Sequence, residues 1–527
     1  MEKIQCHCCP QPKPTVSESV FRLNRRTFMG ASAVAGSVLG GLSWNAVVAG
    51  AASEDIPMPA PRVPLVVKPI LVYDLPVSNN QIGWSWRGWG GVQTPEVARE
   101  EVARITAELN GIKKTADFPV EFLELAAVHN IDSLRDHPDM AKADLLLVYG
   151  AGWGIDSLKD IEKDVIIFQR WNSGPVYVQY EIVSPYFMRQ RTDSLRIPHI
   201  LPEDIVTDCL DELAWRLRAL CGLKNAKNSK IITIGGAGAW FQPGSVVPDR
   251  AKDIWGYEYL DISYEELEKL TKAAMADSAT MAQAKARAEA YLKLPGTKIE
   301  PDTPFSTQPT MEFIVNCFML DKVFRQIMKE AGCRNLTIHG CMTTIMPVAK
   351  TAACLSLTTL NDDDYLVFCE SDFVVVPAGI LLGNITGKPV FLCNPCFPHK
   401  QMMTFAHCTA PRKMDGKNLE PTRIVTHFES DYGAAPKIDY PSGMKLTAIS
   451  TDFASKKWVG LDCEVIGAPH KPICTTQIDV TYKVPSKVFA NRLHGFHWML
   501  GHGDYLKEVG YALRRVGIEW ENFDDIR

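Results

Sequence analysis

The 527-residue chain lacks the features that would mark a nucleic-acid-binding or disordered protein. Its 56 lysines and arginines are outnumbered by 61 acidic residues, so it has no basic excess to attract nucleic acid. It has no low-complexity tract. Beyond the first 52 residues it has no apolar run long enough to cross a bilayer. With a hydrophobic content of 46%, the sequence indicates a globular protein of roughly two or three domains.

The N-terminal segment has the form of a twin-arginine export signal. Arg25 and Arg26 precede a mildly apolar stretch, whose glycines weaken both helix formation and membrane affinity. Residues 49–51 (AGA) have the small-x-small form of a cleavage site. These features predict recognition by the twin-arginine translocase, removal of the signal peptide at 1–52, and a mature protein in the periplasm or outside the cell. An uncleaved membrane anchor is the alternative.

The cysteines lack the regular spacing of a secreted disulfide framework. Three of the fifteen lie in the metal-like run CHCC at 6–9, which precedes the arginines and would be discarded by cleavage. The others are scattered, and several lie in apolar runs, as Cys369 does in YLVFC. We therefore expect mostly buried thiols, which folding before export would make compatible with an oxidising destination.

Apolar runs alternate with helical patterns after a Pro-rich linker at 53–64, and this alternation predicts two α/β domains with parallel sheets. The first, Rossmann-like, spans 65–228, with expected strands at 65–73, 144–149 and 165–168, and helices from Pro95 to about 111 and from Pro202 to about 222. The second, also Rossmann-like, spans 229–387, with strands at 231–234, 335–339 and 366–369, a helical stretch from a capping box at 263–266 to about 294, interrupted by a break, and a helix at 346–360.

The sequence pattern changes after residue 388, where short β-prone runs separated by Gly and Pro turns replace the helical periodicity. The runs are PVFL, TRIVTHFE, KLTAISTDF and QIDVTYKVP. They predict a β-rich, antiparallel and barrel-like C-terminal domain at 388–527, ending in a helix at about 504–516.

Two motifs are weak. The glycine-rich turn at 235–240 follows a strand, but a dinucleotide fingerprint would need glycine where Phe241 stands, so a plain tight turn is favoured. Cys393 and Cys396, followed by His399 and then His407-Cys408, have a zinc-like arrangement without a second cysteine pair. Buried thiols or a local disulfide are favoured there over structural zinc.

Three stretches carry stronger candidates. Trp86, Arg87 and Trp89 follow the first strand, where a sugar or an anion would bind, although a core aromatic cluster explains them equally well. Glu370 and Asp372 directly follow the strand YLVFC, which suits metal binding or proton transfer, although a solvated strand end is an alternative. Three of the twelve histidines, His494, His497 and His502, lie close together, which suits metal ligation or simply the entry to the last helix.

These motifs resemble the L-fucose isomerase and L-arabinose isomerase superfamily. The resemblance lies in TAACLSLTTLNDDDYLVFCESD, in FLCN, and in FHWMLGHGDY before the final helix, mainly within 350–510. It implies two Rossmann-like domains followed by a β-rich domain, an order that matches 65–527. It also implies an oligomer, a trimer or hexamer, and a divalent metal, usually Mn²⁺ with Zn²⁺ or Mg²⁺ as alternatives.

By this resemblance, Glu370 is a metal ligand and the candidate base, and His497 is a metal ligand. The family aspartate falls on Asn394, 24 residues after Glu370, and an amide can bind a hard cation but cannot act as a base. Asp372, His399 or His407 would supply the missing function, and His399, His407 and His494 are also expected substrate contacts.

The resulting expectation is an exported, metal-dependent aldose–ketose isomerase that acts on an open-chain sugar through an enediol. Two alternatives stay open. The scaffold could bind carbohydrate without catalysis, because the metal site has lost its aspartate. It could also catalyse a different metal-dependent carbohydrate reaction, such as epimerisation or hydrolysis.

Overall fold

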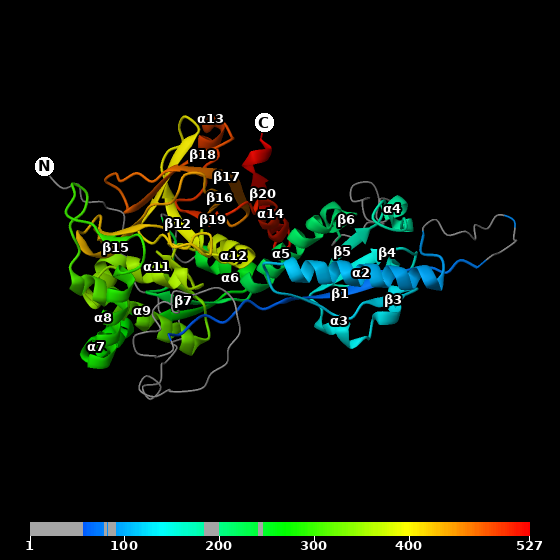
Figure 1. Cartoon of the computed structure of the whole chain (residues 1–527), viewed down its shortest axis with the longest axis horizontal. Coiled ribbons are helices and arrows are strands. Elements are labelled where there is room, and N and C mark those ends of the chain that lie inside the picture. The colour runs from blue at the N-terminus through cyan, green and yellow to red at the C-terminus, as the bar shows by residue number, and fades with distance from the viewer. Residues whose placement is uncertain (1–55, 78–81, 83–90, 184–199, 241–245, 527) are drawn as a thin grey trace. The chain divides into compact units, whose positions relative to one another are not determined.

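The computed structural model describes residues 56–77, 82, 91–183, 200–240 and 246–526. The chain divides into two compact units, Arg62–Lys224 and Asn225–Arg527, the latter together with the segment before Arg62 (Figure 1). The predicted signal peptide and the expected substrate contacts Trp86, Arg87 and Trp89 lie outside the described residues. None of the described helices has the length and hydropathy needed to cross a membrane.

The unit Arg62–Lys224 is built on a parallel sheet with strand order β2-β1-β4-β5-β6, in which β3 also pairs with β1. Its strands are β1 (Leu65–Val72), β2 (Val120–Phe122), β3 (Ala126–Val128), β4 (Leu145–Gly150), β5 (Asp164–Gln169) and β6 (Ile205–Thr207). Every residue of β4 is buried, because helices cover a parallel sheet on both faces. The expected strands at 65–73, 144–149 and 165–168 are therefore confirmed.

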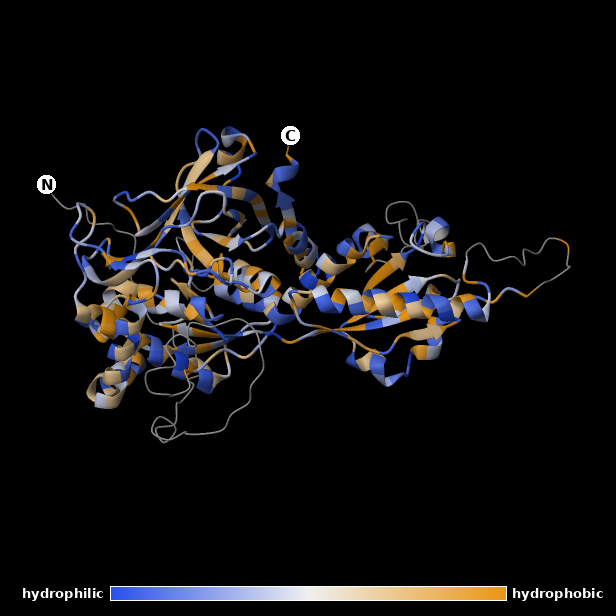
Figure 2. Cartoon of the chain, in the orientation of Figure 1, coloured by the Kyte–Doolittle hydropathy of each residue, from blue (hydrophilic) through white to orange (hydrophobic). Residues whose placement is uncertain are grey.

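The helices of this unit are α2 (Pro95–Thr115), α3 (Pro138–Lys142), α4 (Val178–Val183) and α5 (Leu210–Ala226), with 3₁₀ turns η1 (Ile131–Leu134), η2 (Asp156–Asp160) and η4 (Pro202–Asp204). Thr94 caps α2, and Figure 2 shows the alternating hydropathy of that helix, whose buried side includes Ile105 and Leu109. The expected helix start at Pro202 is wrong. The chain instead forms η4 and β6, and turns at Asp208 (φ 58°), whose carboxylate accepts backbone hydrogen bonds from residues 171–173.

The second unit contains a parallel sheet of order β11-β10-β7-β8. Its strands are β7 (Lys230–Ile234), β8 (Glu258–Ile262), β10 (Asn335–Ile338) and β11 (Leu366–Cys369). Its helices are α6 (Val246–Trp255), α7 (Tyr264–Ala276), α8 (Ser278–Leu292), α9 (Met311–Ala331), α10 (Met346–Ala349), α11 (Cys354–Asp362) and α12 (Val376–Thr386), with a π-helical turn η5 (Cys341–Ile345) before α10.

Two expected helices of this unit are interrupted. Ser263 caps α7 as the capping box predicts, and the expected break lies at Asp277, which ends α7 and caps α8. The single helix expected at 346–360 is wrong in its continuity. Lys350 adopts a left-handed conformation (φ 51°) that ends α10, and α11 begins only at Cys354.

The C-terminal strands form a closed antiparallel barrel of order β16-β19-β12-β13-β18-β17, which the pairing of β16 with β17 closes. Its strands are β12 (Val390–Pro395), β13 (Met402–His407), β16 (Lys445–Thr451), β17 (Lys457–Gly467), β18 (Thr476–Tyr482) and β19 (Trp498–His502), and β20 (Glu519–Asn522) adds to β17 in parallel. Phe391, Phe405 and Trp498 belong to its core. The expected α/β chain with parallel sheets and an antiparallel C-terminal barrel is thus confirmed.

The remaining elements lie beside these layers. A small sheet joins β9 (Thr297–Ile299), β14 (Thr422–His427) and β15 (Tyr432–Ile438). The helices α13 (Ser486–Ala490) and α14 (Leu506–Arg514) and the 3₁₀ turn η6 (Phe523–Asp525) complete the chain.

Candidate metal centre

The candidate site begins at the carboxyl edge of the parallel sheet in the second unit. The strands β7, β10 and β11 are neighbours and run in the same direction, so the residues that follow them lie at one edge. These residues are the turn at 235–240, His339 and Glu370. Open α/β sheets bind ligands at this edge.

Glu370 has a strained backbone that places its carboxylate. Its φ is 71°, a left-handed conformation that costs a residue with a Cβ about 1–2 kcal/mol. Such strain at a non-glycine residue is typical of functional positions. The side chain retains 26% exposure, so a substrate can reach it.

The glycine-rich turn supports the segment after Glu370. Gly238 donates a backbone hydrogen bond to Ser371 (3.1 Å) and accepts one from Phe373 (3.0 Å). A Cβ at Gly238 would lie 2.6 Å from the ring of His339, so this close approach requires glycine. The turn expected from the sequence is therefore present, and its backbone hydrogen bonds hold the segment that follows Glu370.

Asp372 is buried and holds His497 in place. Its Oδ2 lies 2.7 Å from Nδ1 of His497, and its Oδ1 accepts hydrogen bonds from the backbone N–H groups of Trp240 (3.3 Å) and Val374 (3.2 Å). Metal-binding histidines commonly donate their second ring nitrogen to a carboxylate in this way, which fixes the tautomer and leaves the other nitrogen for the metal. The indole of Trp240 also packs edge-on against the His497 ring.

The free nitrogen of His497 faces Glu370. Nε2 lies 3.0 Å from Oε2 of Glu370, yet the two atoms are not aligned as a hydrogen bond, and neither has a hydrogen-bond partner although both are buried. His407 joins them, and one ligand atom from each of the three residues lies within 4.8 Å of the others. Buried ligand atoms that have no hydrogen-bond partner and lie close together are expected where side chains surround a cation.

Asn394 has a similar unpaired atom. Its Oδ1 is buried without a hydrogen-bond partner. The register of β12 against β19 ends with Cys393 opposite Trp498, and its continuation by one residue places Asn394 opposite His497. Residues opposite each other on antiparallel strands face the same side, so a continued register would put this amide on the same side as His497.

The electrostatics distinguish the two histidines. Burial opposes the charged form of His497, but the hydrogen bond to Asp372 and the neighbouring Glu370 outweigh it and raise the pKa of His497 to about 9. Burial lowers the pKa of His407 below its ordinary value, although the charge of Glu370 opposes this effect. A neutral His407 therefore keeps a lone pair for a cation, and a cation would replace the proton of His497.

The donor set suits a divalent transition metal. One carboxylate and two imidazoles bind Mn²⁺, Fe²⁺ or Zn²⁺ with positions left open for a ligand. The residues fit the expected divalent metal, and the donors leave its identity among these ions open.

The other expected site residues lie elsewhere. His399 is exposed, and its Nδ1 lies 3.0 Å from the backbone oxygen of Phe397. The backbone oxygen of His494 accepts a hydrogen bond from Oγ of Ser450, whereas Nδ1 of His502 lies 3.3 Å from Nζ of Lys388. Of the residues expected at the site, the structure therefore gathers Glu370, Asp372, His407 and His497.

Sequence reasoning did not place three features of the site. His407 was expected as a substrate contact and lies among the potential ligands. Trp240 and His339 were not singled out. His339 directly follows β10, the neighbour of β11, and Trp240 ends the turn that follows β7, the next strand of the sheet.

No protein-family model matches the chain, and no curated protein is significantly similar to it.

Proposed function

We propose that this protein is an exported, metal-dependent sugar isomerase of the L-fucose and L-arabinose isomerase type, which interconverts an aldose and a ketose. The observation that carries the proposal is the arrangement of His497 between Asp372 and Glu370, with His407 beside them. The two parallel sheets and the barrel agree with the Rossmann-like pair and β-rich domain of that superfamily. The low charge and absent basic excess agree with a small neutral substrate.

A bound divalent cation would stabilise negative charge on the oxygens of the open-chain sugar. Glu370 is the one partly exposed member of the Glu370–Asp372–His497 set, so its carboxylate is the group placed to take a proton from carbon. The C2–H bond breaks, its electron pair forms the C1–C2 double bond of the enediol, and the carbonyl oxygen O1 takes up a proton. Return of a proton to C1 with loss of the O2 proton then gives the ketose.

His339 is a candidate for the proton transfer between the sugar oxygens. It lies close enough to Glu370 for that charge to act on it. Burial lowers its pKa, so the ring is neutral near pH 7 and can both accept and donate a proton. Asp372, which is fully hydrogen-bonded, serves to orient His497.

The decisive experiment is a sugar screen on the purified mature protein. Its metal content is measured, and the Mn²⁺-loaded protein is incubated with pentoses, hexoses and deoxy sugars in deuterated water. We expect loss of the C2 proton signal of at least one sugar, because an enediol exchanges that proton with solvent even when the equilibrium is unfavourable.

The matched control is Glu258→Gln, an exposed carboxylate at the start of β8, on the opposite edge of the same sheet. It should exchange like the wild type. A protein that binds a sugar but exchanges no proton would instead be a non-catalytic carbohydrate-binding protein, which the amide of Asn394 in place of an aspartate favours. A protein that binds neither Mn²⁺ nor sugar would refute the proposal.

A further inference from the structure

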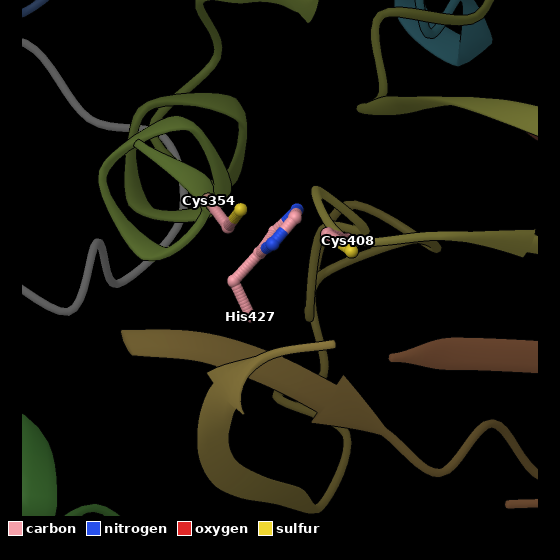
Figure 3. Close-up of side chains that lie close together, drawn as sticks. All are labelled: Cys354, Cys408 and His427. Carbon is pink, nitrogen blue, oxygen red and sulfur yellow. The ribbon is translucent and has the colours of Figure 1, made fainter. Parts of the chain in front are cut away.

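A second group of potential ligands lies in the same unit, outside the centre described above. Cys354 begins α11, Cys408 follows β13, and His427 ends β14. All three side chains are buried, and one ligand atom from each lies within 4.8 Å of the others. Figure 3 shows the ring of His427 between the side chains of Cys354 and Cys408.

A further thiol lies next to this group. Cys474 packs against the same small apolar cluster as Cys354 and Cys408, together with Met346 and Ala435. Interaction with the Cys354 thiol, then with Cys474, lowers the pKa of the Cys408 thiol, whereas burial raises it. The partly buried thiol of Cys474 thus packs against the cluster that holds Cys354 and Cys408, and the four side chains come from separate segments.

The histidine is oriented as a ligand. Nδ1 of His427 lies 3.2 Å from Oγ of Ser430, which leaves Nε2 as the second nitrogen of the ring. A partner on one ring nitrogen fixes the tautomer and the direction of the other. The arrangement matches that of His497, except that a hydroxyl takes the place of a carboxylate.

The donor atoms select the kind of cation. Thiolates and imidazole bind Zn²⁺ and other soft or borderline ions, whereas Mg²⁺, Ca²⁺ and Mn²⁺ prefer oxygen. Four donors of the Cys₃His type complete a tetrahedral zinc shell, and a shell without an open position is typical of structural zinc.

We propose that Cys354, Cys408 and His427 form a second metal site for Zn²⁺, with Cys474 as the fourth ligand. The site is structural, because Cys354, Cys408 and His427 are buried and a fourth ligand from Cys474 leaves no position open for a substrate. A zinc ion at this site would connect the start of α11 to the ends of β13 and β14. The inference does not depend on the sugar chemistry of the first centre.

The test uses Co²⁺ as a spectroscopic substitute for Zn²⁺ on the purified, reduced and metal-free mature chain. We expect a thiolate-to-cobalt charge-transfer absorption that saturates at one equivalent and disappears when Zn²⁺ is added. Cys354→Ser and Cys408→Ser should each lose most of this absorption. Cys463→Ser should retain it, because that thiol is equally buried but lies in the barrel core.

A measurement on the unmodified protein keeps the proposal testable if a variant fails to fold. X-ray absorption at the zinc edge should show sulfur neighbours at about 2.3 Å and a nitrogen neighbour at about 2.0–2.1 Å. Three results would overturn the site: no cobalt–thiolate absorption, an unchanged absorption in Cys354→Ser, or a disulfide between Cys408 and either Cys354 or Cys474 in the mature protein. Failure of the sugar screen leaves this absorption unaffected, so the two proposals fail separately.

Discussion

The two ligand clusters of the second unit differ in their chemistry although two consecutive residues, His407 and Cys408, contribute one ligand to each. One combines the Glu370 carboxylate with two imidazoles, and the other combines thiols with the imidazole of His427. Oxygen and nitrogen donors suit Mn²⁺ or Fe²⁺, and sulfur suits Zn²⁺. With both proposed sites loaded, one fold would select two different metals by donor atom alone.

The two clusters also differ in the exposure of their side chains to solvent. The Glu370 side chain is 26% exposed, whereas Cys354 is 1% and Cys408 3% exposed. A centre that reacts with a substrate needs a reachable ligand, and a structural centre does not. The exposed carboxylate thus marks the reactive cluster, and the buried thiols mark the structural one.

The largest effect is expected from Glu370→Gln. The amide cannot take a proton from carbon, so deuterium exchange at C2 should fall at least about 100-fold. Cobalt–thiolate absorption should stay as in the wild type, because the thiol cluster keeps all its donors. Exchange at the wild-type rate would remove Glu370 from the reaction and end the contrast between a reactive and a structural cluster.

A gain is expected from Asn394→Asp. A carboxylate beside His497 adds a negative charge to the first centre, so calorimetric titration should show roughly tenfold or tighter Mn²⁺ binding. Without metal the same variant should unfold more readily, because the new buried charge lacks a partner. Unchanged Mn²⁺ affinity would show that this side chain does not face the cation.

The side chains that orient the two histidines, Asp372 for His497 and Ser430 for His427, allow a matched comparison. Asp372→Asn should weaken Mn²⁺ binding by about 10–100-fold, as loss of an outer partner of a ligand usually does. Ser430→Ala should weaken Zn²⁺ binding by about tenfold or less, because a neutral hydroxyl bonds less strongly than a carboxylate. Competition with a chelator measures both. Equal losses of metal affinity in the two variants would show that the charge of Asp372 contributes no more than the neutral hydroxyl of Ser430.

The smallest effect concerns the backbone of Glu370. At φ 71° alanine is strained and glycine is not, so Glu370→Gly should be more stable than Glu370→Ala by about 0.5–1 kcal/mol in denaturant unfolding. The same pair at Glu258, in strand β8, should show the opposite order. A less stable glycine variant at 370 would argue against the strain.

The sequence predicted the strands better than the helices. Runs such as LLLVY and LVFC are continuous and apolar, which is what a sheet covered on both faces requires. The helix α12 gave no signal, because it is buried on every side and so lacks a polar face. The helix α9 was also missed, and its buried Asp321 and Arg325, which pair with each other, obscure its apolar pattern.

The site residues that directly flank a strand could be predicted from the sequence. Glu370 and Asp372 come directly after β11, and His497 stands directly before β19. The thiol cluster was not predictable, because Cys354, Cys408 and His427 are far apart in the chain and share no spacing. The zinc-like spacing around Cys393 included Cys408, yet the structure places Cys408 with Cys354 and His427 instead. All twelve described cysteines are free and nine are buried, as their apolar surroundings predicted.

The peptide bond between His407 and Cys408 joins the two clusters directly. A cation held by Cys408 would restrict the backbone that carries His407, so loading of one centre would change the affinity of the other. Such coupling is reciprocal by thermodynamic necessity. The order in which two metals enter would then affect the rate of assembly but not the final state.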